Sequence, residues 1–300
     1  MRWFPVFLSL GMVCSSAPLA TQAQTRIPKY IADVRTLEAQ QQYTKALVIL
    51  DGVLKNRPND LAALWWHTRQ LAFLDKVDGM LEDCNRLIKA DPKAEKFPHI
   101  YTYRAMVYQN MDETAKAMQD LDKSKLLGQM DGHYRVCRFE CLQTLGKLDE
   151  AISELDQIVE SKPPILDHWL SKRANLLEAT NRPDKALADW NKAIELNPKK
   201  PGHWASRARL LEHLHRYDEA IADYSHLLKL DPSEETIYFK RGKLYLATGK
   251  YKLALADLDQ SISLDPMPSA TAYECRAQIY DKLGDSAKAK KDRVTATKIR

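Results

Sequence analysis

Apolar residues recur along most of the chain in steps of three and four, the spacing that places side chains on one face of an α-helix. In residues 201–234 the apolar set is Trp204, Ala208, Leu211, Tyr217, Ala220, Tyr224, Leu227 and Leu228. In residues 235–269 it is Tyr238, Gly242, Tyr245, Tyr251, Ala254, Leu258 and Ile262. Each segment therefore predicts two amphipathic helices in succession, with an apolar stripe on each.

The two-helix pattern repeats with a nearly constant period. Prolines at predicted helix ends recur at intervals of 34, 71, 35, 34 and 34 residues, and the longest interval is two periods with the middle proline missing. They are Pro58, Pro92, Pro163, Pro198, Pro232 and Pro266. A second column, mostly alanine, precedes them: Ala46, Met80, Ala117, Ala151, Ala186, Ala220, Ala254 and Ala289. Proline stops a helix and a small residue lets two helices approach closely, so the period predicts stacked helix pairs.

These columns resemble the tetratricopeptide repeat family, whose pattern places Trp, Leu, Gly and Tyr on a first helix and Ala, an aromatic residue, Ala and Pro on a second. The resemblance covers residues 24–300. It implies an all-α fold, a right-handed superhelical solenoid of antiparallel helix pairs. About eight repeats, numbered one to eight, are expected at residues 27–60, 61–97, 98–131, 132–166, 167–200, 201–234, 235–269 and 270–300.

Six repeats carry an arginine at the seventh place and an acid sixteen residues later. The arginines are Arg104, Arg138, Arg173, Arg207, Arg241 and Arg276, and the acids are Asp120, Glu154, Asp189, Asp223, Asp257 and Asp292. The arginine at the seventh place lies on the first helix of the repeat, and the acid lies on the second helix. We therefore predict an ion pair that clamps the two helices of each of these repeats. These arginines are therefore not counted as ligand-binding residues.

In the tetratricopeptide family the first helices line a groove that holds peptides, which implies groove-facing side chains at fixed places of each repeat. The predicted peptide-binding residues are Arg35, Trp65, Arg69, Arg209, Phe239 and Lys243. This mixture suits a peptide with acidic residues and one or two apolar anchors. Arg35, Trp65 and Arg69 are expected to form one patch. The alternatives are a merely solvated groove face, or a Trp65 that packs between repeats while Trp66 faces solvent.

The first 23 residues predict a secretory signal peptide. Arg2 supplies a positive start, an apolar run follows, and small residues precede the expected cleavage after Ala23, so the mature chain should begin at Gln24. The run is too short to span a bilayer, and no other segment is apolar enough. A periplasmic or secreted protein of the bacterial cell envelope is expected. A buried N-terminal helix and a lipid anchor on Cys14 are the alternatives.

The remaining composition narrows the chemistry. The net charge is +5, and basic and acidic residues are mixed along the chain, so nucleic acid is not an expected partner. No phosphate loop, catalytic triad or Cys-x-x-Cys motif is present, and we predict no enzyme activity, no cofactor and no metal site. An enzyme or cofactor carrier built on the solenoid stays as a minor alternative. So does a metal site at His133, Cys137 and Cys141, whose spacing places them on one helix face.

Two sets of polar residues stay open. One is a row of histidines at equivalent places, either solvated or sensitive to pH or metals: His99, His133, His168 and His203. The other is the set of cysteines after the signal peptide, whose pairing the sequence does not determine: Cys84, Cys137, Cys141 and Cys275. The expected function is a non-catalytic scaffold or adaptor that binds proteins or peptides. The alternative is a structural, self-assembling protein whose last repeat docks on another copy.

Overall fold

The structure is a computed structural model that describes residues 27–74, 76–77, 79–265 and 267–299. Over these residues it contains sixteen α-helices and no strand, which confirms the predicted all-α fold of helix pairs. The segment predicted as a signal peptide, residues 1–23, lies outside the described residues. No helix within the described part is long and apolar enough to cross a bilayer.

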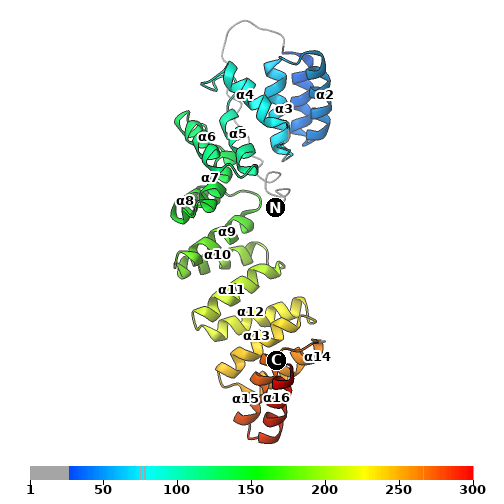
Figure 1. Cartoon of the computed structure of the whole chain (residues 1–300), viewed down its shortest axis with the longest axis vertical. Helices are drawn as coiled ribbons and strands as arrows, with labels where there is room; N and C mark the ends of the chain where they lie inside the picture. The colour runs from blue at the N-terminus through cyan, green and yellow to red at the C-terminus, as the bar shows by residue number, and fades with distance from the viewer. Residues whose placement is uncertain (1–26, 75, 78, 266, 300) are drawn as a thin grey trace. The chain divides into compact units, whose positions relative to one another are not determined.

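The helices alternate between a first and a second helix of each repeat (Figure 1). The first helices are α1 (Lys29–Ala39), α3 (Leu61–Phe73), α5 (Ile100–Asn110), α7 (Gly132–Thr144), α9 (Leu166–Ala179), α11 (Pro201–His213), α13 (Glu235–Ala247) and α15 (Ala270–Lys282). The second helices are α2 (Tyr43–Asn56), α4 (Met80–Ala90), α6 (Thr114–Leu126), α8 (Leu148–Glu160), α10 (Pro183–Leu196), α12 (Tyr217–Leu230), α14 (Tyr251–Leu264) and α16 (Ser286–Ile299).

The described residues form two compact units, those up to residue 169 (the N-terminal unit) and those from residue 170 on (the C-terminal unit), and the division falls within α9. In the N-terminal unit α2 contacts α3, α4 contacts α5 and α6 contacts α7, so a second helix packs against the first helix of the next repeat. In the C-terminal unit α10 contacts α11, α12 contacts α13 and α14 contacts α15 in the same way. Each unit is therefore a stack in which neighbouring repeats share their core.

The column of small residues lies where the paired helices meet. All eight of its members have 0% exposed surface, as predicted for positions of close helix approach. Gly242 on α13 extends this contact, because a Cβ there would lie 3.2 Å from both Asp257 Cβ and Leu258 Cγ of α14. A larger residue at position 242 would push the two helices apart.

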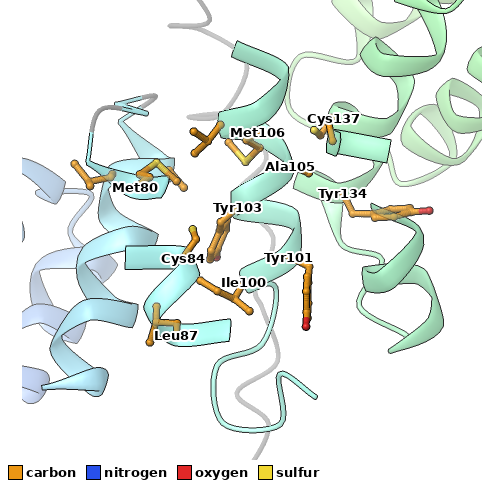
Figure 2. Packing of buried hydrophobic residues seen from close by; sticks show 14 of the residues in the cluster. Met80, Cys84, Leu87, Ile100, Tyr101, Tyr103, Ala105, Met106, Tyr134 and Cys137 are labelled. Carbon is orange, nitrogen blue, oxygen red and sulfur yellow. The ribbon is translucent and has the colours of Figure 1, made fainter. Parts of the chain in front are cut away.

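A large core cluster lies in the N-terminal unit, where α4, α5 and α7 pack together (Figure 2). Met80 and Cys84 of α4 face Tyr103 of α5, and Cys137 of α7 lies beyond Ala105. All four cysteines in the described residues are buried and unpaired with one another. Within the same part of the chain no group of three or more His, Cys, Asp or Glu side chains is arranged to hold a metal ion. The cysteines act as small apolar packing residues.

The turn within a repeat places one residue in the left-handed region of backbone space. Glycine occupies it at Gly146, Gly249 and Gly284, with φ of 69°, 73° and 84°. Four other repeats adopt the same conformation without glycine, at Gln41, Asp112, Asn181 and His215, with φ of 57°, 59°, 57° and 57°. The turn geometry is thus a property of the repeat, and the sequence reveals it only where glycine is present.

Candidate functional site

The arginines at the seventh place clamp the two helices of their repeats, as predicted. In five repeats the guanidinium binds both carboxylate oxygens of the acid sixteen residues later. The pairs are Arg104–Asp120, Arg173–Asp189, Arg207–Asp223, Arg241–Asp257 and Arg276–Asp292, with N–O distances of 2.6–2.9 Å. In the sixth, Arg138 Nε lies 3.2 Å from Glu154 Oε1. These arginines hold the fold together and are not part of a ligand site.

Five of these arginines also contact the preceding repeat, a link that was not predicted from the sequence. Their Nη1 atoms donate to a polar side chain two places after the preceding repeat's acid or its equivalent. We call these positions the acceptor column. The observed contacts are Arg104–Asn85, Arg138–Asp122, Arg207–Asn191, Arg241–Ser225 and Arg276–Asp259, at 2.7–3.0 Å. Each of these arginines therefore joins three helices and ties consecutive repeats together.

In the N-terminal unit, Arg69 forms an ion pair with another residue of the same chain. Its Nη2 lies 2.7 Å from Glu38 Oε1 and its Nε 3.2 Å from Glu38 Oε2, which joins α3 to α1. Gln70 Nε2 donates to the same carboxylate at 2.7 Å. The guanidinium lies 5.5 Å from the ring centroids of Trp65, Trp66 and Phe73, and the side chain is only 15% exposed.

Trp65 is half-buried and packs against the core clusters on both sides of α3. Its indole Nε1 donates to the carbonyl oxygen of Pro98 at 3.2 Å, which joins α3 to the segment before α5. Trp66 is buried, so the alternative in which it faces solvent is wrong. The exposed Arg35 lies 5.6 Å above the Trp66 ring. The structure thus gathers the three predicted patch residues around one aromatic cluster, but Trp65 and Arg69 also support packing.

In the C-terminal unit the predicted groove residues are more accessible. Arg209 Nη2 lies 2.8 Å from Glu178 Oε2, and the arginine side chain is 48% exposed. Glu178 Oε1 in turn accepts a hydrogen bond from Trp190 Nε1 at 2.8 Å. Lys243 is exposed, and its Nζ lies 5.6 Å from the ring centroid of the half-buried Phe239. Repeats six and seven therefore present a cation each at the ninth place, and repeat seven adds an aromatic surface.

The contacts of these residues reveal a second link between repeats. A polar residue at the twelfth place binds the ninth-place residue of the next repeat, 31 residues later. The pairs are Glu38–Arg69, Gln109–Glu140 and Glu178–Arg209, at 2.7, 2.7 and 2.8 Å. The complementary residue types were visible in the sequence. The link becomes visible only when the residues at the twelfth place are compared with the ninth-place residues of the next repeat.

Two histidines of the predicted row meet at one carboxylate in the N-terminal unit. His99 Nδ1 and His133 Nδ1 lie 3.5 Å and 3.3 Å from Asp131 Oδ2. Burial acts to raise the pKa of Asp131, but the His133 hydrogen bond and the charges of both histidines lower it to about 2. Burial lowers the pKa of His99. His133 and His203 are buried, so a solvated row is wrong for these two members.

The geometry so far defines a class, an all-helical repeat protein in which an ion pair clamps the two helices of a repeat and polar contacts join neighbouring repeats. Models described as tetratricopeptide repeat match residues 168–200, 190–222 and 235–266, and one described as TPR repeat matches residues 214–249. The chain therefore contains tetratricopeptide repeats, which these models place across residues 168–266.

Solved structures share this fold. The MamA RS-1 ArsTM double mutant aligns with a TM-score of 0.50 and 13% identity, over 55% of this chain and 92% of that chain. MamA 41-end from Desulfovibrio magneticus RS-1 aligns with a TM-score of 0.49 and 13% identity, over 55% and 92% of the two chains. A tetratricopeptide repeat protein from Parabacteroides merdae ATCC 43184 aligns with a TM-score of 0.35 and 19% identity, over 90% and 91%. No curated protein matches the chain.

Proposed function

We propose that this chain is a non-catalytic scaffold that binds another polypeptide on the first helices of its C-terminal unit. The observation that supports this most is the pair of accessible ninth-place cations, Arg209 and Lys243, with Phe239 beside the second. Tetratricopeptide repeats generally present such helices to peptides. Cations next to a half-buried aromatic ring suit an extended peptide that carries carboxylates and one apolar anchor.

Glu178 gives this surface a defined geometry. It holds Arg209 through one carboxylate oxygen and is itself held by Trp190 through the other. An arginine fixed on one side loses less side-chain entropy when a ligand carboxylate binds its remaining donors. Lys243 lacks such a rigid fork and acts as a point charge. Arg209 is therefore the residue expected to set the position of the peptide.

Peptide binding tests the proposal directly. A library of peptides rich in aspartate, glutamate and apolar residues is screened against the intact chain, and the affinity of the selected peptide is measured by calorimetry. Arg209→Ala and Lys243→Ala should each weaken binding about tenfold, while Lys252→Ala, an exposed lysine of α14, serves as the matched control. Equal affinities for all three variants would contradict the proposed surface.

The N-terminal patch is a weaker part of the same proposal. Arg35 is its accessible cation, whereas Arg69 already binds Glu38. A peptide that uses Arg69 has to displace Glu38 or share the guanidinium with it. We therefore place the main binding surface in the C-terminal unit and assign Arg35, Trp65 and Arg69 a secondary role.

Features of the last repeat support a scaffold over head-to-tail self-assembly. Its acceptor-column position holds Val294, which is 47% exposed and offers no acceptor to the arginine of a further repeat. Leu255 of α14 is half-buried and packs against a core cluster, whereas the equivalent residue of α16 is the exposed Lys290, followed by the exposed Lys291. The outer face of α16 is therefore basic, and a stack of copies would bury these charges. Sedimentation of the intact chain as a monomer is the expected result.

The proposed setting is the periplasm or the outside of a bacterial cell. Its support is the sequence of the first 23 residues alone. N-terminal sequencing of the protein recovered from the exported fraction should start at Gln24. Recovery of the protein only in the cytoplasm, with Met1 or Arg2 at its start, would contradict export.

A further inference from the structure

Repeat two departs from the clamp pattern at the seventh place, where it carries His67 instead of arginine. Both partners of a clamp arginine are nevertheless present. The imidazole Nδ1 lies 3.0 Å from Asp83 Oδ2, the acid sixteen residues later. The imidazole Nε2 lies 3.1 Å from Asp51 Oδ1, the acceptor-column residue of repeat one. His67 thus joins α2, α3 and α4 in the way that arginines join three helices elsewhere.

An imidazole differs from a guanidinium because its number of N–H donors depends on pH. Protonated imidazole has two donors, one for each carboxylate, and carries the charge that both carboxylates favour. Neutral imidazole has one donor, so one of the two contacts then places a nitrogen lone pair against a carboxylate oxygen. A guanidinium keeps its charge and its donors at every physiological pH. The same position therefore behaves differently in repeat two.

We propose that His67 is a pH-dependent link between the first two repeats, strong when the imidazole is protonated and weak when it is neutral. Histidine side chains change charge between about pH 5 and 8. Both contacts of the ring are made to carboxylate oxygens, so both can be hydrogen bonds only when the imidazole carries two N–H donors. The link acts on the packing of α2 against α3 and does not depend on the proposed peptide surface.

The other charged groups around this joint do not titrate in the same range, because carboxylates and guanidiniums ordinarily keep their charge between about pH 5.5 and 8. They are Glu38 of α1 with Arg69 of α3, Asp60 before α3 with Arg57, and Arg104 of α5 with Asp120 of α6. His99 and His133 also lie next to a carboxylate in this unit, both at Asp131. The test therefore has to separate His67 from these two.

Hydrogen exchange of the α2, α3 and α4 amides in the intact chain makes this separation when wild type is compared with His67→Arg. The variant restores the residue of the other repeats and leaves His99 and His133 in place, so their contributions cancel in the ratio. We expect wild-type protection, relative to the variant, to fall roughly fivefold between about pH 5.5 and pH 8, as suits a partly exposed ion pair. An unchanged ratio at the two pH values overturns the proposal.

A second variant keeps the test decisive if His67→Arg does not fold. Asp51 is exposed, and Asp51→Asn introduces the residue found in the acceptor column at Asn85 and Asn191. Neutral imidazole can then donate to Asp83 and accept from the asparagine amide. We expect at least half of the pH dependence to disappear. The exposed Glu82→Gln on α4 is the matched control and should retain it. Full pH dependence in Asp51→Asn also overturns the proposal.

Discussion

Arg69 in the N-terminal unit and Arg209 in the C-terminal unit occupy the same ninth place of their repeats, and each binds a glutamate of the preceding repeat. Arg69 is nevertheless 15% exposed and Arg209 is 48% exposed. One helical turn earlier, the fifth place is Trp65 in the first case and Ala205 in the second. The tryptophan covers the guanidinium, whereas the alanine leaves it accessible. Three aromatic rings, those of Trp65, Trp66 and Phe73, therefore surround Arg69 and limit its accessibility to a partner.

The largest effect that this comparison predicts is at Trp65. Trp65→Ala should lower the free energy of unfolding by about 2–4 kcal/mol, because the ring packs against two core clusters and donates to Pro98. This expectation follows the alternative in which Trp65 packs between repeats. Urea denaturation followed by far-UV circular dichroism measures the loss.

Phe239→Ala in the C-terminal unit is the control for this substitution. Phe239 occupies the same fifth place and packs against only one core cluster among the described residues. Its loss should cost about half as much as that of Trp65. If Phe239→Ala proves the more destabilising of the two, the contrast between a covered and an accessible groove is wrong.

The next effect is at the clamps, which both units share. Arg207→Ala strands Asp223, whose side chain is 3% exposed, and should cost about 2 kcal/mol. A double-mutant cycle with Asp223→Ala should show a coupling energy of the same order. Arg216→Ala removes an exposed pair with Glu219 in the same repeat and should change stability within measurement error. Additive costs for the Arg207 and Asp223 substitutions would argue against the clamp.

The clamps show which part of the architecture the sequence specifies. Arg207 and Asp223 recur at a fixed separation, so period and chemistry together predicted that they pair. The contact of Arg207 Nη1 with Asn191 in the preceding repeat was not predicted. The acceptor-column residues that an arginine contacts are Asp, Asn or Ser, so they share a hydrogen-bond acceptor but not one residue type. A column whose residues share only a hydrogen-bonding property is harder to detect in a sequence than a column that repeats one residue type.

The third effect concerns the glutamates that hold the groove arginines. Glu38→Gln should cost about 1 kcal/mol, because Glu38 accepts three hydrogen bonds, two from Arg69 and one from Gln70. Glu178→Gln should cost less, because its arginine is nearly half exposed. Thermal denaturation of both variants under one buffer measures the difference. An equal loss in the two variants would show that exposure of the arginine does not control the strength of this link.

The candidate site was less predictable than the fold. Arg69 and Arg209 look alike in the sequence, and their exposure depends on contacts with Glu38 and Glu178 from the preceding repeat. Those partners lie 31 residues away, so they become neighbours only when the repeats stack. Sequence columns predicted which side chains belong to the first helices. They did not predict which of these side chains form ion pairs or hydrogen bonds with one another.

The smallest effect is expected in the turns within repeats, where one residue has a left-handed backbone conformation in both units. Gln41 in the N-terminal unit and His215 in the C-terminal unit have φ of 57°, and glycine removes the steric cost of that conformation. Gln41→Gly should raise the free energy of unfolding by about 0.5 kcal/mol, since part of the gain is offset by the greater entropy of the unfolded chain. His215→Gly should gain less, because His215 Nδ1 also makes a 2.7 Å hydrogen bond with the Tyr217 hydroxyl. Chemical denaturation measures both. Destabilisation by Gln41→Gly would mean that its side chain supports the turn, and the shared turn geometry would then have different causes in the two units.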